Sequence, residues 1–380
     1  MSMPADLLII GAGPFGLSLA AHARMLGLET VVFGQPMGFW KEHMPRGMIL
    51  RSACDWHLDA DNRLTIEAFL QARGQTPDDV EPLSRDLYLD YAEWFRHQAG
   101  IEPLFGTVRS LERRTDGFAA VLDDGAELTA RNVAVAVGFS NFPQVPPELA
   151  DMIPAGRRSH TCDMVDFAAL KGKRCLIVGG RQSAFEWAAL LADEGAAQVH
   201  VSHRHDSPAF APSDWSWVNP LVDAMADDPG WFRSLSGTEQ DALARRLWIE
   251  GRSKVEPWLE PRVMRPNVAL WPRTALASCR ETGDGLAVTL DDGRTLLVDH
   301  VILATGYKVE IGRVPFLAGL LGDLAVRDGF PVLDDHFQTS IPGLFITSMP
   351  ATRDFGPFFA FTISVRTSAC LIGQALAAEK

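Results

Sequence analysis

Three glycines near the amino terminus have the spacing of a turn that binds a dinucleotide. They stand in the run Gly11-Ala-Gly13-Pro14-Phe15-Gly16. The first glycine permits a tight turn, the second lets the backbone approach a pyrophosphate, and the third lets a helix pack closely on the preceding strand. The amino terminus of that helix would face the phosphates. The run therefore predicts a nucleotide cofactor here, with Pro14 and Phe15 beside it.

A second run, at residues 179–184, repeats this pattern with one substitution. It reads Gly179-Gly-Arg181-Gln182-Ser183-Ala184, so an arginine replaces the glycine that lets the backbone approach phosphate. Ala184 is an accepted alternative to the third glycine. The Arg181 guanidinium would either contact a pyrophosphate or block it. We favour contact, because Gln182 and Ser183 still place polar groups at a helix amino terminus.

The residues that end the second strand of each unit indicate the type of cofactor. An acidic residue there binds the ribose hydroxyls of NADH, whereas an arginine suits the 2′-phosphate of NADPH. The first unit has Gln35, a candidate ribose ligand, and the second has His203-Arg204-His205. Arg204, with His203 beside it, therefore favours NADPH, the alternative being a basic surface loop. We expect both histidines at a solvated strand end, without a metal.

Strand and helix patterns place both runs at the first turn of a βαβ unit. A short apolar run, typical of a buried parallel strand, precedes each turn, and an apolar-rich helical stretch and a second apolar run follow it. The expected elements are strands 6–10 and 30–33 around a helix ending at 26, and strands 173–178 and 198–202 around a helix ending at 191.

Two strand meanders extend these units and form an internal repeat of organisation. Each closes at a strand end that contains alanine and glycine. Val108, in the first meander, is a further candidate cofactor residue. The repeat predicts two similar nucleotide-binding modules, the second inserted in the first. The expected strands are 105–110, 118–122 and 127–137, and later 286–290 and 295–304.

The segment 206–271 differs from both modules. It holds six of the ten tryptophans and basic residues such as Arg245, Arg246, Arg252 and Lys254. We interpret it as a mostly helical insertion. Its aromatic side chains either pack the insertion itself or line a substrate pocket.

Composition excludes several classes of protein. Lys and Arg number 35 against 48 Asp and Glu, and the resulting net charge of −13 argues against nucleic acid or an anionic membrane as a partner. The five cysteines are odd in number and scattered, without zinc-like spacing, so we expect no disulfide framework. No apolar run is long enough for a membrane helix. A cytoplasmic protein is the default expectation.

Two dinucleotide folds in this order, joined by Ala304-Thr-Gly-Tyr307, resemble the two-domain flavoproteins, and within them the flavin-dependent monooxygenases of the class B type. Two departures limit the likeness. Pro154 and Met164 replace the aromatic residues of the strict Baeyer–Villiger signature, and Thr347-Ser-Met349 replaces a Gly-Asp pair that binds the flavin ribityl in related reductases. The other carriers of the resemblance are residues 11–16, 38–40, 44–48, 50–52, 156–160, 299, 343–346 and 355–357.

The resemblance implies an α/β protein with two Rossmann-like domains and the cofactors FAD and NADPH. The FAD-binding domain would comprise residues 1–155 and 300–380, and the NAD(P)-binding domain residues 156–299, with the insertion inside it. Arg51 and Ser52 are candidate hydrogen-bond donors near the flavin. The aromatic residues expected either to line the cofactor or to pack the core are Phe15, Trp40, Phe355 and Phe358; Tyr307 and Gly356 are further cofactor candidates.

The implied activity is oxygenation of a small molecule. NADPH would reduce FAD, reduced flavin would react with O₂ to form a C4a-(hydro)peroxyflavin, and that species would deliver one oxygen atom, with N- or other heteroatom hydroxylation favoured. The alternatives are an NAD(P)H-dependent flavin reductase or oxidase acting on a quinone or other small acceptor, and a flavin-binding sensor without turnover. A disulfide reductase is disfavoured because no redox cysteine pair is present. A homo-oligomer is compatible with the sequence.

Overall fold

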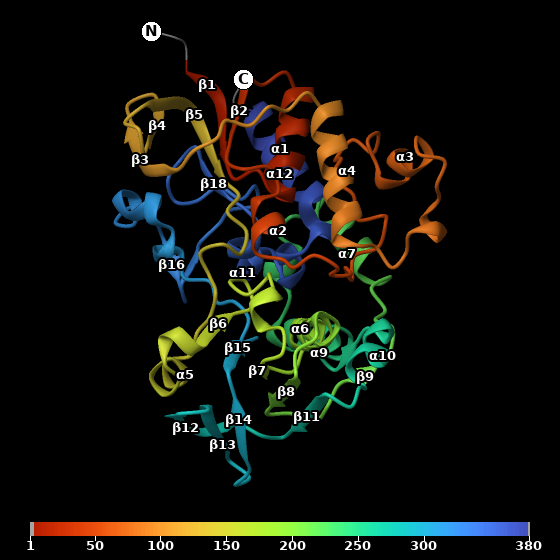
Figure 1. The fold of residues 1–380 in the computed structure, drawn as a ribbon. Coiled ribbons are helices and arrows are strands. Elements are labelled where there is room, and N and C mark those ends of the chain that lie inside the picture. Colours follow the sequence, from red (N-terminus) through yellow and green to blue (C-terminus); the bar gives the residue numbers. More distant parts are fainter. Residues whose placement is uncertain (1–3, 379–380) are drawn as a thin grey trace.

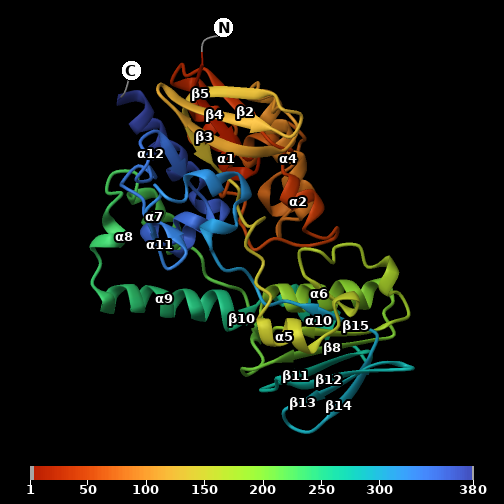
Figure 2. The same cartoon turned by 90° about the vertical axis from the view of Figure 1, so that its left-hand side faces the viewer.

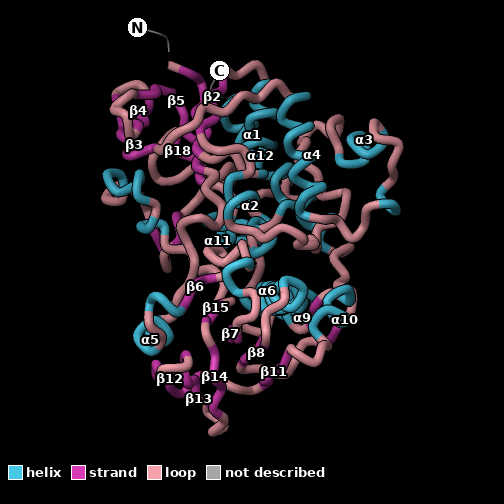
Figure 3. Tube along the Cα trace, in the orientation of Figure 1, coloured by secondary structure: helices cyan, strands magenta, loops and turns pink. Residues whose placement is uncertain are grey.

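The computed structural model describes residues 4–378 and shows two α/β modules, one above the other (Figure 1). Both ends of the described chain, β1 and α12, lie in the upper, first module, and the middle of the chain forms the second. The chain enters and leaves the second module through loops (Figure 3). This arrangement confirms the predicted α/β class, with a second Rossmann-like module inserted in the first.

The sheet of the first module has the strand order β2-β1-β5-β4-β3, and β18 also pairs with β5. Parallel pairing joins β1 to β2 and to β5, while β3, β4 and β5 are antiparallel. Because β1 is covered on both faces, Leu7 and Ile9 are fully buried. The strands are β1 (Ala5–Ile10), β2 (Thr30–Phe33), β3 (Val108–Arg114), β4 (Gly117–Leu122), β5 (Glu127–Val135) and β18 (Leu344–Ile346).

Helices pack against this sheet and against one another (Figure 2). Helix α1 lies so close to α12 that a Cβ on Gly373 would stand 2.6 Å from the His22 ring. The helices of this module are α1 (Pro14–Met25), α2 (Gly38–Glu42), α3 (Ile66–Gln71), α4 (Arg85–Gln98), α11 (Thr352–Phe355) and α12 (Val365–Ala378); a short hairpin, β16 (Val326–Arg327) and β17 (Phe330–Pro331), precedes β18.

The sheet of the second module is entirely parallel, in the order β11-β8-β7-β15-β6. Helix α6 packs on it, and a three-stranded antiparallel sheet lies below it in Figure 1. The elements are α5 (Pro147–Met152), β6 (Arg158–His160), β7 (Arg174–Val178), α6 (Gln182–Glu194), β8 (Gln198–His203), β11 (Val268–Pro272), β12 (Leu276–Thr282), β13 (Gly285–Leu290), β14 (Thr295–Val298) and β15 (His300–Leu303).

The strand expected over 295–304 is in fact two strands in two different sheets. The chain turns at Asp299, whose carboxylate accepts hydrogen bonds from Arg174 N–H (2.8 Å) and from the Arg174 guanidinium (2.7 Å). Residues after this turn pair with β7 and β6 as β15. The second module therefore extends beyond residue 299, the boundary that the sequence suggested, to the end of β15.

The segment 206–271 contains helices but ends in a sheet strand. Trp271 belongs to β11, so the last part of the segment is an element of the second sheet. Helices α7 and α8 lie against the first module, and α9 runs from there to the second (Figure 2). The elements are β9 (Ala209–Phe210), α7 (Val218–Ala224), α8 (Trp231–Ser234), α9 (Gly237–Arg252), β10 (Lys254–Val255) and α10 (Glu260–Val263).

None of the helices in residues 4–378 has the length and apolar character needed to cross a lipid bilayer.

Candidate functional site

The carboxyl ends of the parallel strands in both sheets point toward the same region between the modules (Figure 1). The chain leaves β5 and β15 through two linkers that hydrogen-bond to each other: Gln144 N–H donates to the Gly306 carbonyl, and Lys308 N–H to the Phe142 carbonyl, each at 2.9 Å. Ligands of open α/β sheets bind at the carboxyl ends of the strands. The two glycine turns, which follow β1 and β7, therefore face a common space.

The first glycine turn has the geometry of a phosphate cradle. Gly11 has φ +119°, and a Cβ there would stand 2.3 Å from the Ala136 carbonyl oxygen. A Cβ on Gly16 would stand 1.8 Å from the Gly11 carbonyl oxygen, whereas one on Gly13 would meet no described heavy atom within 4 Å beyond its chain neighbours. The turn is thus closely packed at Gly11 and Gly16 and open at Gly13, which lies at the amino terminus of α1. Pro14 is the first residue of α1, and Phe15 is buried.

The second glycine turn repeats this construction. Gly179 has φ +146°, and its Cβ would lie 2.4 Å from the Ala304 carbonyl oxygen. Arg181 is the N-cap residue of α6, an exposed side chain at the position that corresponds to Gly13. Gln182 and Ser183 form the first turn of α6, and Ala184 is buried against the sheet.

The prediction of a solvated strand end at His203 is wrong. His203 is 3% exposed, because β8 is an inner strand of the sheet and Gly180 packs against the side chain. A Cβ on Gly180 would lie 2.5 Å from the His203 Cβ. Its Nδ1 lies 2.9 Å from the His205 carbonyl oxygen, while its Nε2 has no hydrogen-bond partner in the described chain. Arg204, next in sequence, is exposed at the end of β8.

The segment that leads to Val108 passes beside the end of β2, next to Gln35 in sequence. Gln35 is exposed just after β2. The Leu104 carbonyl accepts from Gly34 N–H at 2.9 Å, so the segment that leads into β3 passes beside the end of β2. The Val108 side chain itself is buried in the core.

Trp40 lies parallel to Tyr88, with ring centroids 4.8 Å apart, and packs against the same core.

Protein groups already surround the Arg51 guanidinium. Its Nε donates to Glu256 Oε1 at 2.8 Å, and its other nitrogens donate to Ser213 and to the carbonyls of Glu250 and Gly251. Burial lowers the pKa of Arg51, and the Glu256 carboxylate opposes that change. Arg51 thus fastens the loop after α2 to the insertion. The hydroxyl of Ser52 lies 3.2 Å from that of Thr362.

Of the aromatic candidates, Tyr307 lies at the joint between the modules and Phe355 lies in the core. The Tyr307 ring contacts Phe139 and His160, with centroids 5.0 and 5.3 Å apart. Phe355 is fully buried and stacks on Phe337, with centroids 3.8 Å apart. Gly356 has φ +94° and faces the ring of Phe232 in α8. Phe358 is buried in a cluster with Trp56 and the insertion residues Val218 and Val222.

Two buried polar side chains have atoms without a partner in the described chain: Thr347, which the sequence analysis noted only as part of a replaced motif, and Arg85, which it did not single out. The Thr347 hydroxyl, at the carboxyl end of β18, has no hydrogen-bond partner in the described residues, and Thr347 N–H binds the Val135 carbonyl at the end of β5. The Arg85 side chain is also buried, and its Nε and Nη1 atoms lack such partners there, with the nearest carboxylate oxygen, Asp86 Oδ1, 3.5 Å from Nε. Arg85 follows a helix N-cap serine and looks like a surface residue in sequence.

Buried cysteines give no redox pair. All five cysteines are free, and Cys162 lies beside His160, with Sγ and Nδ1 3.0 Å apart. Burial raises the pKa of the Cys162 thiol to about 12 and lowers the pKa of His160, so the pair is neutral near pH 7. A neutral, buried thiol is a poor nucleophile.

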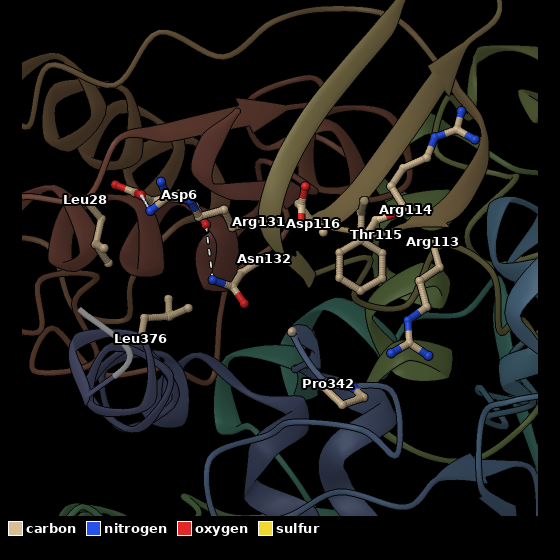
Figure 4. Close-up of a pocket in the computed structure, with 13 residues that line it drawn as sticks. Asp6, Leu28, Arg113, Arg114, Thr115, Asp116, Arg131, Asn132, Pro342 and Leu376 are labelled. Atoms are coloured by element: carbon tan, nitrogen blue, oxygen red, sulfur yellow. Dashed lines mark hydrogen bonds and ion pairs between the residues drawn. The ribbon is translucent and has the colours of Figure 1, made fainter. Parts of the chain in front are cut away.

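A hollow of about 450 Å³ lies away from the candidate site (Figure 4). It is lined at the amino end of β1 by Asp6, which pairs with Arg131 at 3.2 Å, and by residues around Gly117 and Pro342. None of the predicted site residues lines it. Because nucleotides bind at carboxyl ends of strands, this hollow is not the cofactor site.

Comparison with known proteins agrees with this geometry. The chain is 28% identical to an FAD-dependent urate hydroxylase of Xanthomonas campestris pv. campestris, over 99% of this chain and 83% of that protein. It is 27% identical to an indole-3-pyruvate monooxygenase of Oryza sativa subsp. japonica, over 84% of this chain and 80% of that protein. The structure of an ornithine N-hydroxylase of Kutzneria sp. 744, solved with reduced FAD and NADP⁺, superposes with a TM-score of 0.83 at 19% identity, covering 99% of this chain and all of that one.

A family model gives the classification. The model described as pyridine nucleotide-disulphide oxidoreductase matches residues 8–227, more than half of the chain, including both glycine turns. The match confirms the predicted class of enzyme, an FAD-dependent oxidoreductase that uses a nicotinamide nucleotide. The predicted resemblance to flavin-dependent monooxygenases, and the cofactor pair FAD and NADPH, agree with the relatives described above. The chain belongs to the pyridine nucleotide-disulphide oxidoreductase family.

Proposed function

We propose that the protein is a monooxygenase that binds FAD in its first module and NADPH in its second. The reaction converts substrate, O₂, NADPH and a proton into oxygenated substrate, NADP⁺ and water. The observation that carries the proposal is the opposition of the two glycine turns across the joint between the modules. Hydride transfer needs the two cofactors in contact, and two nucleotide sites that face one space allow this.

The first turn fits FAD. The open space in front of Gly13 admits a pyrophosphate, and the uncapped amino terminus of α1 offers backbone N–H groups to it. The unpartnered Thr347 hydroxyl belongs to the run Thr347-Ser-Met349, which replaces the Gly-Asp pair that binds the ribityl chain in many related reductases. When bound, FAD would supply electron transfer and the reaction with O₂.

The second turn fits NADPH. Arg204 and Arg181 place exposed guanidinium groups at the end of β8 and at the start of α6, the positions expected for the 2′-phosphate and the pyrophosphate. An acidic residue that would select NADH is absent from that strand end, which reads Ser202-His203-Arg204-His205.

The chain's own residues would position and shield the reaction. Phe139, Tyr307 and Phe39 pack together at the joint, with Phe139 and Tyr307 centroids 5.0 Å apart and Phe39 within 6.2 Å of both. An aromatic cluster there limits the access of water to the reacting atoms. The absence of a cysteine pair among the described residues disfavours disulfide reduction.

Heteroatom hydroxylation of a small molecule is the favoured oxygenation. The relatives are named for hydroxylation of urate and of the ornithine nitrogen, and for oxygenation of indole-3-pyruvate. These compounds, with the lysine and cadaverine named for two monooxygenases of similar fold, form the first substrate panel. The scattered free cysteines suit a reducing compartment, so we place the enzyme in the cytoplasm, to be checked by cell fractionation.

The decisive experiment follows NADPH oxidation by the purified flavin-containing protein under ¹⁸O₂, with each panel compound in turn. Stoichiometric transfer of one ¹⁸O into product supports the proposal. Rapid NADPH oxidation that yields only hydrogen peroxide with every panel compound, together with rapid anaerobic reduction of a quinone, favours the reductase alternative. Failure of NADPH to reduce the flavin contradicts both.

A further inference from the structure

The carboxyl end of α9 lies against the amino terminus of α6, although α9 belongs to the insertion (Figure 2). Glu256, just after α9, donates its N–H to Gln182 Oε1 at 3.1 Å. Arg51 binds the Gly251 carbonyl in the last turn of α9 at 3.0 Å. These two contacts hold the end of α9 beside the second glycine turn.

Two arginines from different elements share the ring of Trp248, which lies in this part of α9. The guanidinium carbon of Arg181, from the glycine turn, is 5.1 Å from the ring centroid, and that of Arg252, the last residue of α9, is 4.8 Å away. Cation–π attraction positions both guanidinium groups. Trp248 remains 45% exposed, so a ligand can reach the group.

These arginines, with Arg204, form a cluster of positive charge without a counter-ion. Partial burial, together with the charges of Arg252 and Arg204, lowers the pKa of Arg181 to about 10. No ion pair among residues 4–378 joins Arg181, Arg204 or Arg252 to a carboxylate. Nearby Arg273, in contrast, pairs with Asp206 at 3.3 Å. The like charges of these arginines repel one another, and a bound polyanion would relieve that repulsion. The cluster is also unusual in a chain whose net charge is −13.

We propose that Arg252 binds the 2′-phosphate of NADPH together with Arg204, and that Trp248 is a positioning residue that orients Arg252 and Arg181. The inference rests on the proposed use of NADPH and extends its site from the second module into the insertion. Arg204 marks the end of β8, where the adenosine ribose of a bound dinucleotide lies in this fold. Arg181 occupies the glycine turn. The guanidinium groups of Arg181, Arg204 and Arg252 would thus surround the phosphate-bearing half of the cofactor.

Calorimetric binding of adenosine 2′,5′-bisphosphate and of AMP to the flavin-loaded protein tests this without turnover. Arg252→Gln should weaken binding of the bisphosphate about tenfold or more and leave AMP binding unchanged, because only the 2′-phosphate contact is lost. Trp248→Leu should weaken binding of the bisphosphate and, because Arg181 also loses its ring contact, binding of AMP to a smaller extent, and Trp248→Phe should restore both. Arg245→Gln, an exposed arginine about two turns earlier in α9, is the matched control and should change neither.

The outcomes separate this inference from the proposed function. If the wild-type protein binds the two nucleotides with equal affinity, it does not recognise a 2′-phosphate. The assignment of NADPH then fails together with this inference. If the wild type prefers the bisphosphate and Arg204→Ala removes that preference while Arg252→Gln does not, only the role of α9 is overturned. Equal losses for both nucleotides in Arg252→Gln also overturn it.

Discussion

Glu186 of α6 accepts a hydrogen bond from the Ile49 N–H, at 3.3 Å, across the boundary between the two modules. The carboxylate is fully buried. It also accepts from Gln182 Nε2 at 3.3 Å, and Gln182 in turn binds the N–H of Glu256, the partner of Arg51. A chain of hydrogen bonds thus connects the loop after α2, the amino-terminal part of α6 and the insertion.

Replacing Glu186 by Gln should make stability less dependent on pH. Burial raises the pKa of Glu186 to about 7. The folded protein therefore binds a proton that the unfolded chain releases between about pH 4.3 and 7, so this group's contribution falls as pH rises through that window. Glu186→Gln keeps an acceptor for Ile49 and removes the ionised form. The variant should gain stability relative to wild type at pH 8, by up to about 3 kcal/mol, and lose this advantage near pH 5.

Thermal unfolding of both proteins between pH 5 and 8.5 measures this difference. Glu194→Gln, an exposed carboxylate at the end of the same helix, is the control and should follow the wild-type curve. A difference between wild type and Glu186→Gln that is constant with pH would contradict the assignment.

Alanine at Gly13 and at Gly16 should have different effects. Gly13 has φ −81° and open space, so Gly13→Ala should fold with a nearly unchanged melting temperature in the flavin-free form but bind FAD at least tenfold more weakly. Gly16→Ala pushes a methyl group into the Gly11 carbonyl and should cost about 1–3 kcal/mol of folding free energy or more. Calorimetry and flavin titration of both variants check this. Normal FAD affinity in Gly13→Ala would falsify the FAD assignment of this turn.

Thr347→Val should separate flavin binding from stability. The hydroxyl has no partner among the described residues, so its replacement by a methyl group should leave the flavin-free protein as stable as wild type, or up to about 1 kcal/mol more stable. If the hydroxyl serves FAD, affinity for the flavin should fall several-fold. Thr339→Val is a useful contrast, because that hydroxyl already bonds the Ile341 carbonyl at 3.2 Å and its loss should lower stability. Unchanged flavin affinity in Thr347→Val would show that the hydroxyl does not face the cofactor.

Arg204→Ala should raise the KM for NADPH at least tenfold and leave the KM for NADH nearly unchanged. The reason is the loss of a charge-assisted hydrogen bond that only the 2′-phosphate makes. Arg273→Ala is the matched control, since Arg273 is exposed near the same strand end but already paired with Asp206. Steady-state rates of flavin reduction with both nucleotides provide the test. Equal effects on the two KM values would disprove a 2′-phosphate contact.

Asp299→Asn should lower the free energy of unfolding at neutral pH. The Arg174 hydrogen bonds lower the pKa of Asp299, so its stabilisation is present at neutral pH and is lost as pH falls through that lowered value. The substitution should cost about 1–3 kcal/mol at pH 7, because it replaces charge-assisted bonds by neutral ones. Urea unfolding at pH 7 and at pH 3 should show a difference at pH 7 that shrinks in acid. A difference that persists unchanged at pH 3 would point to packing instead.

Local pattern alone determined the parts of the site that are built by backbone. The two glycine runs, the buried strands before them and the helices after them follow from residue spacing, because a tight turn and close helix packing tolerate few side chains. The expected strand over 30–33 is found as β2, and the helix expected to end at 26 is found as α1, ending at Met25. Arg204 also lies at the strand end where the sequence put it.

Tertiary structure decided which side chains have partners. The resemblance of residues 50–52 to flavoproteins suggested that Arg51 donates hydrogen bonds to the flavin. In the structure its partners are instead protein groups some 160 to 205 positions away in the sequence. Arg85, Thr347 and Glu186 carry no local signal, because their burial is created by segments distant in sequence. The division of 295–304 into β14 and β15 likewise depends on Arg174, which no local period reveals. The sequence by itself determined two nucleotide folds, the second inserted in the first. Long-range packing alone placed the insertion helix α9 across them and left the arginine cluster around Trp248 without a carboxylate partner in the described chain.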